Sequence, residues 1–395
     1  MTVRNQTVLI SGASIAGPAL AYWLDHYGFR VTVVERAPEL RRGGQAVDFT
    51  GATHHEVLRR MGILEQVYAH RTGTTDIEFV DDDNRRLALM SGDFTGGDVE
   101  ILRGDLARIM YEKTGGDCEY RFGDTITALT EDADGVLVEF EHAAPRRFDL
   151  VFGADGIHSR TRRLAFGPER EFVRHLGHYY CVAGASPWLD RPEGEPQRVL
   201  AQSYNAPGRA AISGGPKAQQ TYIFAAPELD YDRDDLDAQR RIVARTFAGM
   251  GGPVPGMLAE LDGFDDFYLD SIAKVRRMGS YTRGRIALVG DAGYGNTLGG
   301  FGTGLAIVGA YILAGELAVA GGEYTTAFAR YDEIMLGYTK LADSSNAGRF
   351  FAPKTALGIR FRNWFLGSKG MDLMVRMAAK SKNIELVDYP ALALK

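Results

Sequence analysis

Cysteine is scarce in this chain, which contains only Cys118 and Cys181 among its 395 residues. Two cysteines do not make a disulfide framework or a metal site, and both are expected to be core or half-buried residues. The eight histidines are scattered, and the pair His54 and His55 has no second pair at metal-ligand spacing. The sequence therefore predicts no metal site.

Clusters of Lys and Arg are also missing, and the formal net charge is −6. This balance argues against a nucleic-acid-binding surface. The N-terminus has no cationic region followed by a cleavage site. The longest apolar run, 305–320, is interrupted by Gly309, Gly315 and Glu316 and is too short and too polar to span a bilayer. We therefore expect a cytoplasmic protein with no nucleic-acid partner and no stable membrane association.

The remaining composition is typical of a soluble globular protein, with 45% apolar and 24% charged residues. The length exceeds the usual size of one hydrophobic core, so two domains are expected. No internal repeat is visible.

Residues 6–36 have the pattern of a βαβ unit. An apolar run at 7–10 predicts a buried strand, and a glycine-rich turn then leads into a helix. Gly28 ends that helix, and the apolar run at 31–34 predicts the second strand.

The turn and the end of this unit carry the residues expected to bind a dinucleotide. Gly12 and Gly17 allow close approach of a pyrophosphate, the helix N-terminus attracts its charge, and Glu35 accepts hydrogen bonds from a ribose. Ser14 stands where the middle glycine of G-x-G-x-x-G is usual, and its β-carbon occupies space next to the pyrophosphate.

Later segments suggest that this first domain is interrupted and resumed. Patterns predict a helix at 54–68, a hairpin at 76–90 and a three-stranded meander between 119 and 140. Short aromatic strands between 179 and 225 predict a separate antiparallel sheet. Buried strands at 150–153 and 285–289, each followed by a turn with Gly and Asp, return to the first domain.

Three motifs in this order carry a resemblance to a known family. Gly-Ala-Ser-Ile-Ala-Gly at 12–17, Gly-Ala-Asp-Gly at 153–156 and Gly-Asp-Ala at 290–292 resemble the single-component FAD-dependent monooxygenases, the aromatic hydroxylase family. Arg-Gly-Asp-Leu at 103–106 is similar to the R-x-D-L element of that family. Residues 43–48 resemble its tetracycline-inactivating branch.

The resemblance implies an α/β fold in which a Rossmann-like FAD-binding domain carries an inserted antiparallel-sheet substrate domain and a C-terminal helical segment. The implied FAD-binding domain is discontinuous and comprises 1–75, 100–170 and 276–335. The substrate domain comprises 76–99 and 171–275, and the helical segment 336–395.

The resemblance also implies roles for single residues. Arg103 would contact the phosphate–ribityl part of FAD, and Asp291 a ribityl hydroxyl. Asp155 and Gly156 would lie near FAD and help a nicotinamide cofactor to dock. Helix N-capping is the structural alternative for both aspartates. The full implied cofactor-binding set is Gly12, Ser14, Ile15, Ala16, Gly17, Glu35, Arg36, Arg42, Gln45, Asp48, Arg103, Asp155, Gly156, Asp291, Gly300 and Gly302.

The loop at 293–302 departs from the family pattern. It lacks the usual prolines, and Phe301 stands where Gln is common. A helix N-terminus still follows and can support negative charge on reduced flavin. The departure predicts a less rigid loop and leaves the efficiency of hydroxylation open.

Candidate substrate residues come from the aromatic strands, with core packing as an equally weighted alternative. They are Tyr179, Gln202, Tyr204, Tyr222 and Phe224.

By resemblance, NADPH or NADH transiently reduces FAD, and O2 then forms a flavin hydroperoxide that hydroxylates a bulky aromatic or polyketide-like molecule, with antibiotics among the candidates. FAD carries this chemistry, so no catalytic side chain is expected. Two alternatives stay open: a non-oxygenating FAD enzyme of natural-product metabolism (cyclase, dehydratase or oxidase), or a binding protein for a hydrophobic metabolite with structural FAD. We expect a monomer or a weak homodimer.

The apolar and basic tail at 350–380 fits either a membrane-surface helix or packing across the domains, and packing is favoured.

Overall fold

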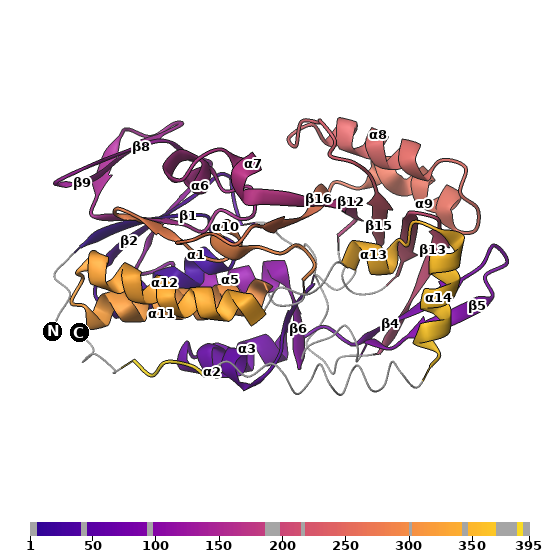
Figure 1. The fold of residues 1–395 in the computed structure, drawn as a ribbon, viewed down its shortest axis with the longest axis horizontal. Helices are drawn as coiled ribbons and strands as arrows, with labels where there is room; N and C mark the ends of the chain where they lie inside the picture. The colour runs from indigo at the N-terminus through magenta and orange to yellow at the C-terminus, as the bar shows by residue number, and fades with distance from the viewer. Residues whose placement is uncertain are drawn as a thin grey trace.

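Two β-sheets at opposite ends of an elongated molecule organise the fold (Figure 1). The computed structural model describes residues 6–40, 46–92, 98–185, 198–214, 218–299, 302–341, 347–368 and 385–389. Arg42, Gln45 and Gly300 of the predicted cofactor set lie outside these ranges. The predicted α/β fold class is confirmed.

The first sheet has six strands in the order β17-β18-β11-β1-β2-β7. All neighbours in it run parallel except β17 and β18. The strands are β1 (Thr7–Ser11), β2 (Arg30–Glu35), β7 (Glu119–Phe122), β11 (Leu150–Gly153), β17 (Thr282–Arg283) and β18 (Ile286–Leu288).

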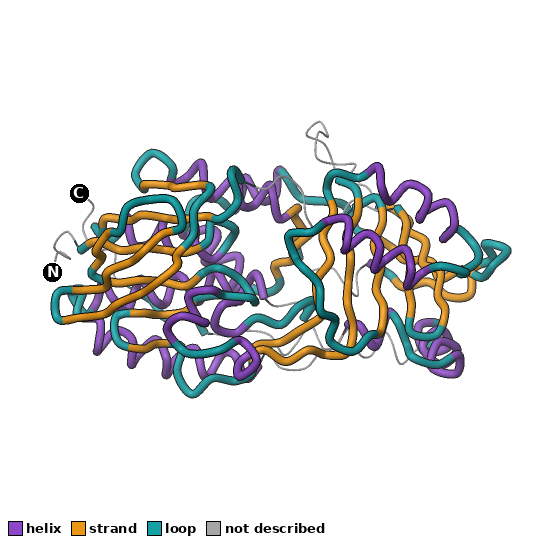
Figure 2. The backbone as a smooth tube through the Cα atoms, turned by 90° about the horizontal axis from the view of Figure 1, so that it is seen from above, coloured by secondary structure: helices purple, strands orange, loops and turns teal. Residues whose placement is uncertain are grey.

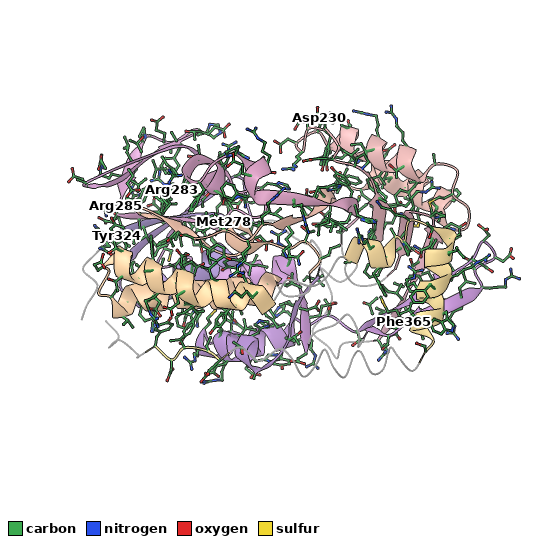
Figure 3. The ribbon with its side chains drawn as sticks, in the orientation of Figure 1. Asp230, Met278, Arg283, Arg285, Tyr324 and Phe365 are labelled. Carbon is green, nitrogen blue, oxygen red and sulfur yellow. The ribbon has the colours of Figure 1, made fainter. Side chains whose placement is uncertain are left out.

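Both faces of this sheet are covered, which explains the continuous apolar runs in its strands. Val8 and Ile10 of β1 face a helical layer, whereas Leu9 between them packs on a small three-stranded sheet. The helices include α1 (Ala16–His26), α5 (Arg103–Thr114), α11 (Gly302–Val319) and α12 (Tyr324–Leu341), and the small sheet consists of β8 (Ile126–Asp132), β9 (Gly135–Phe140) and β10 (Arg146–Phe148). Figure 3 labels Arg285 and Tyr324, where the guanidinium lies 4.9 Å from the ring centroid and ties the sheet to α12.

Two local predictions were wrong for identifiable reasons. The predicted three-stranded meander does not form, because β7 pairs with β2, which is distant in sequence, and not with β8. The helix predicted at 54–68 is split into α2 (Ala52–Arg60) and α3 (Leu64–Ala69). Gly62 between them has φ of +70°, the left-handed conformation that commonly ends a helix. A short antiparallel pair, β3 (Ala46–Phe49) and β6 (Val99–Leu102), lies near these helices.

The second sheet has seven strands in the order β16-β12-β15-β14-β13-β4-β5. Its strands are β4 (Thr75–Val80), β5 (Arg86–Met90), β12 (Val173–Ala183), β13 (Val199–Ala206), β14 (Arg209–Ser213), β15 (Gln220–Ala225) and β16 (Phe267–Val275). The sheet is mixed rather than purely antiparallel, because β13 pairs in parallel with β4. The edge strand β16 was missed in the sequence.

Helices cover both faces of the second sheet (Figure 2). One face packs on α8 (Leu236–Phe247) and α9 (Val254–Glu260), and a 3-10 turn, η1 (Leu261–Gly263), follows. The other face meets α13 (Ala347–Phe351) and α14 (Ala356–Leu366). Three short helices complete the fold: α6 (Arg160–Ala165) packs on β8 and β11, α7 (Glu169–Phe172) contacts β12, and α10 (Asp291–Tyr294) contacts β16.

The helix α11 is long and apolar enough to cross a membrane by length and composition, with a mean hydropathy of 1.6, so the sequence argument against spanning was too strong. Burial decides the question instead: α11 packs against α1, α2 and α12. The returning segment 385–389 also docks on it, since the Tyr389 hydroxyl donates to Glu316 at 2.7 Å. It is the core helix of this half of the molecule.

We predict that Leu313→Ala lowers the free energy of unfolding by about 2–5 kcal/mol, because Leu313 of α11 is fully buried and a cavity would replace its side chain. Val319→Ala, at the exposed end of the same helix, is the matched control and should change it by less than about 0.5 kcal/mol. Guanidinium unfolding of both variants measures the difference. Equal effects would mean that α11 is not buried as described.

Candidate functional site

Four predicted cofactor segments meet at one edge of the six-stranded sheet. Parallel strands β1, β2, β11 and β18 all end there. Gly12 follows β1, Glu35 ends β2, Asp155 follows β11 and Asp291 follows β18. In doubly wound folds this edge binds ligands, at the point where the strand order reverses, which here is the end of β1.

The turn after β1 requires glycine at two positions. A β-carbon on Gly17 would lie 1.8 Å from the Gly12 carbonyl oxygen. Gly12 has φ of +109°, and a β-carbon there would lie 2.4 Å from the carbonyl oxygen of Ala154. The turn can therefore hold β1, α1 and the end of β11 together only without side chains at these positions.

The N-terminus of α1 is suited to an anion. Ile15 is its N-cap residue and gives no side-chain hydrogen bond, and the first turn, which includes Ala16 and Gly17, has no acidic residue. The backbone N–H groups there can therefore donate to a phosphate.

Arg103 begins α5 and adds a positive charge to this end of the site. Its Nε donates to the Ser14 hydroxyl at 3.0 Å. Ser14 thus orients the guanidinium, a role that the steric interpretation of the sequence did not include. Glu35 holds the opposite side of the turn, because its carboxylate accepts from the backbone N–H of Ala13 at 2.8 Å and of Ala37 at 2.9 Å.

Asp291 occupies the first turn of α10 at the end of β18. Surrounding protein raises the pKa of its carboxyl group by desolvation, and the charge of Arg103 opposes that shift. A β-carbon on Gly302 would lie 3.4 Å from the Asp291 Oδ1 atom, so the start of α11 closely approaches this carboxylate. Arg103 and Asp291 therefore border the same space.

The buried Arg162 fixes this arrangement and was missed in the sequence, where it is one of several arginines in a basic stretch. Its guanidinium donates to the backbone oxygens of Ala292 at 2.7 Å and Ile157 at 2.6 Å. It therefore ties the turn after β11 to the turn after β18.

Other predicted cofactor residues have different surroundings. Asp155 accepts from the Thr161 N–H at 2.8 Å and hydroxyl at 2.9 Å in the first turn of α6, whose N-cap residue is Ser159. Gly156 has φ of +80° in the same turn. Arg36 is exposed and forms an ion pair with Asp234 at 3.0 Å. Asp48 lies on β3, opposite Glu100 of β6.

The five substrate candidates lie on the face of the second sheet that packs on α8 and α9, or at its margin. Tyr179, Tyr222 and Phe224 are buried in that core, so core packing, the alternative, describes these rings. Tyr204 packs at the edge of the same core and hydrogen-bonds Asp82. Gln202 lies two residues before it and contacts Glu78 at 3.4 Å.

The opposite face of the sheet turns toward the cofactor edge. Tyr180 and Ile223 lie there with Leu298, which comes from the loop after α10. Because side chains alternate along a strand, the residues next to the predicted candidates, such as Tyr180 and Ile223, lie on this opposite face.

A polar chain runs through this face toward the first sheet. His158 lies three residues after Asp155, and its ring nitrogens contact Glu169 at 2.8 Å and Asp270 at 3.0 Å. The Tyr268 hydroxyl donates to Asp270 at 2.7 Å. Although 38% of its surface is exposed, Tyr268 is surrounded by enough protein that desolvation raises its pKa well above the ordinary value. No sequence motif indicates this polar cluster, because Asp270 and Tyr268 lie more than 100 residues after His158.

The donors and acceptors at the sheet edge fit FAD. An uncapped helix N-terminus and Arg103 suit a pyrophosphate, and the carboxylate of Asp291 suits a polyol. Among the described residues no group of three or more potential ligands could hold a metal ion.

Comparison with known proteins agrees with this fit. Residues 5–327 match a protein family described as FAD binding domain. A flavin-dependent monooxygenase of Legionella longbeachae is 38% identical over 85% of this chain and 86% of its own length. The chain belongs to the FAD-dependent monooxygenase family.

Other known proteins are also similar to this chain. An uncharacterized protein of Mycobacterium tuberculosis is 40% identical, over 85% of this chain and 91% of its own. The crystal structure of the tetracycline destructase Tet(55) has a TM-score of 0.78 at 33% identity, over 98% of this chain and 100% of that chain. Tet(51) also has a TM-score of 0.78, at 31% identity over 98% and 99%.

We predict that the Ser14 hydroxyl positions Arg103 for FAD. Ser14→Ala and Ser14→Gly should then weaken FAD binding equally, by roughly tenfold, because each removes a hydrogen bond to a charged group worth about 1.5 kcal/mol or more. Quenching of flavin fluorescence on titration measures both dissociation constants. Tighter binding by the glycine variant than by the alanine variant would instead support the steric interpretation.

A second prediction concerns pH and His158. Burial alone would lower the pKa of His158, but hydrogen bonds from its ring to Asp270 and Glu169 outweigh burial, and the pKa is raised. The stabilisation that protonated His158 provides is therefore complete at pH values below its unfolded-state pKa of about 6.5. It is lost as the pH rises through the pKa of His158 in the folded protein.

His158→Gln should accordingly cost roughly 3 kcal/mol near pH 6 and clearly less near pH 9, as for loss of one partner of a buried ion pair. Urea unfolding at the two pH values measures this. His70→Gln is the control, since that ring contacts the backbone oxygen of Gln66. A loss for His158→Gln that does not change with pH would contradict an ionic contact.

Proposed function

We propose that this monooxygenase uses NADPH or NADH and O2 to hydroxylate a bulky aromatic or polyketide-like molecule, with antibiotics of the tetracycline type among the candidates. The observation that carries the proposal is the gathering of the Gly12 turn, Arg103 and Asp291 at one edge of the six-stranded sheet, where Arg103 donates to Ser14 at 3.0 Å and the start of α11 approaches the Asp291 carboxylate.

Leu298, from the loop after α10, packs there with Tyr180 and Ile223 of the second sheet. Burial raises the pKa of Tyr180, and the charges of Arg103 and Asp291 also influence this pKa, which supports their proximity.

The residues have separate tasks in this proposal. The N-terminus of α1 with Arg103 would hold the FAD pyrophosphate, Glu35 the adenosine ribose and Asp291 the ribityl chain. Bound FAD would supply the redox and oxygen-activating chemistry. The protein would orient the substrate and exclude water around it.

The substrate side of the proposal rests on the face that carries Tyr180, Ile223 and Tyr268. Its apolar side chains suit a planar ring system, and the Tyr268 hydroxyl can hydrogen-bond a phenolic or enolic oxygen. This replaces the substrate set proposed from the sequence, three members of which are buried on the other face.

The reductant and the domain arrangement are also proposals. The six-stranded sheet with its helices would form the FAD-binding domain and the seven-stranded sheet the substrate domain. No second G-x-G-x-x-G unit occurs in the sequence, so the nicotinamide cofactor would visit the site transiently near Asp155 and Gly156. We propose a cytoplasmic enzyme that is a monomer or a weak homodimer and is not stably bound to membranes.

Tetracycline destructases as structural neighbours over nearly the whole chain favour the hydroxylation of an antibiotic-like substrate over the alternatives. A non-oxygenating FAD enzyme and a binding protein with structural FAD would use the same residues for the cofactor. They differ from the proposal in O2-dependent consumption of NAD(P)H and in the product mass.

The test is to add NADPH or NADH under air to the FAD-loaded enzyme with a panel of phenolic polyketides, tetracyclines included. At least one compound should accelerate nicotinamide oxidation and gain about 16 mass units, one oxygen atom. Some H2O2 should form beside the product, because the proline-free sequence at 293–302 predicts a less rigid loop next to the flavin. Asp291→Ala should bind FAD roughly ten- to a hundredfold more weakly. Asp237→Asn on α8 is an exposed carboxylate control.

Negligible flavin reduction by either nicotinamide across the panel, with a compound nevertheless bound or cyclised, would contradict the monooxygenase reaction. It would favour the non-oxygenating enzyme if product appears, and the binding protein if none does. An unchanged FAD dissociation constant in Asp291→Ala would remove the ribityl role of that residue alone.

A further inference from the structure

Helix α14 exposes a stripe of large apolar side chains. Leu357, Phe361 and Trp364 are 75%, 65% and 67% exposed. Their spacing of four and three residues places them on one face of the helix, and the rings of Phe361 and Trp364 lie 5.7 Å apart. Single exposed apolar residues are ordinary, but three contiguous ones on a helix mark an interaction surface.

The opposite face of α14 is fixed to the protein, so the stripe cannot turn inward. Arg362 is buried there, donates to the backbone oxygen of Phe351 at 3.0 Å and to Asn205 Oδ1 at 3.1 Å, and lies 3.8 Å from the Phe79 ring centroid. Leu366 packs in the same small core. Figure 3 labels Phe365, a neighbour in this packing, at the outer end of the molecule.

The charge around the stripe is positive although the whole chain is acidic. Residues 347–368 contain four Lys and Arg and no Asp or Glu. Arg349, Lys354 and Arg360 among them are exposed. The following sequence, 369–382, adds four more basic residues and a single acidic one, Asp372. This part of the chain is therefore locally basic, although the whole chain has a net charge of −6.

We propose that this face of α14 docks reversibly on an anionic lipid bilayer. Trp and Phe are suited to the interface between headgroups and acyl chains, and nearby Lys and Arg are attracted to anionic headgroups. The helix lies on the outer edge of the seven-stranded sheet, away from the cofactor end (Figure 1), so docking leaves the site free.

A second copy of the chain fits this face less well. A two-fold contact would bring the same basic residues of both copies together, with no acidic residue in 347–368 to balance them. Three side chains also offer much less than the roughly 800 Å² per partner of a stable interface. The bilayer satisfies both the charge and the small apolar area, and weak binding agrees with an enzyme that is not stably bound.

The experiment is co-sedimentation of the FAD-loaded full-length protein with phosphatidylcholine vesicles, with and without about 30% phosphatidylglycerol. With three exposed basic residues near the surface, each worth about 1 kcal/mol, binding to the anionic vesicles should be stronger by on the order of a hundredfold, and raised salt should abolish the difference. The emission of Trp364 should shift to the blue on binding, and Trp364→Phe should lose that shift.

The variant Leu357→Ser/Phe361→Ser/Trp364→Ser should lose at least tenfold in vesicle binding while keeping its FAD content and unfolding midpoint. Leu87→Ser/Leu200→Ser is the matched control, because both leucines are 53% exposed on other elements, and it should bind like the parent. Equal binding by the triple variant and the control, or no binding to anionic vesicles, would overturn the proposal. So would a dimer at low concentration, detected by light scattering, that the triple variant no longer forms.

Discussion

The cofactor end of the molecule depends on one close backbone approach. Gly17, at the start of α1, lies so near the Gly12 carbonyl that no β-carbon fits between them, and Gly12 in turn touches the backbone after β11. This contact brings two strand ends and a helix N-terminus together. The anion-binding geometry follows from it, because the same N–H groups that cannot bond within the helix point out of the turn.

The two halves of the molecule meet partly through a largely buried charged cluster. His158, from the turn after β11, is held between Glu169 and Asp270, and Asp270 belongs to the second sheet. Arg162 holds the neighbouring turns of the first sheet through backbone oxygens. Buried ionic contacts of this kind add little net stability, but they require defined geometry, so they orient the two sheets around the proposed site.

Alternation along strands explains why the substrate face expected from the sequence differs from the substrate face that we propose. Tyr179 and Tyr180 are adjacent, yet one packs under α8 and the other faces the cofactor edge. The two faces are both apolar, since helices or the other half of the molecule cover each of them. A pattern of alternate aromatic residues therefore cannot show which face carries the ligand, and only the placement of α8 and α9 resolves it.

The βαβ unit, the order of the cofactor motifs, the α/β class and most strand positions could be predicted from the amino-acid sequence. These features depend on local apolar runs and on turns that only glycine allows. The family resemblance at 12–17, 153–156 and 290–292 was also local. Other features could be seen only in the folded structure. These are the pairing of β7 with β2, the contact of Arg103 with Ser14 and the contact of His158 with Asp270. The burial of α11 and the exposed apolar face of α14 are further examples. Each of these depends on contacts between residues far apart in the chain, and neither periodicity nor composition specifies which distant partner covers a given face.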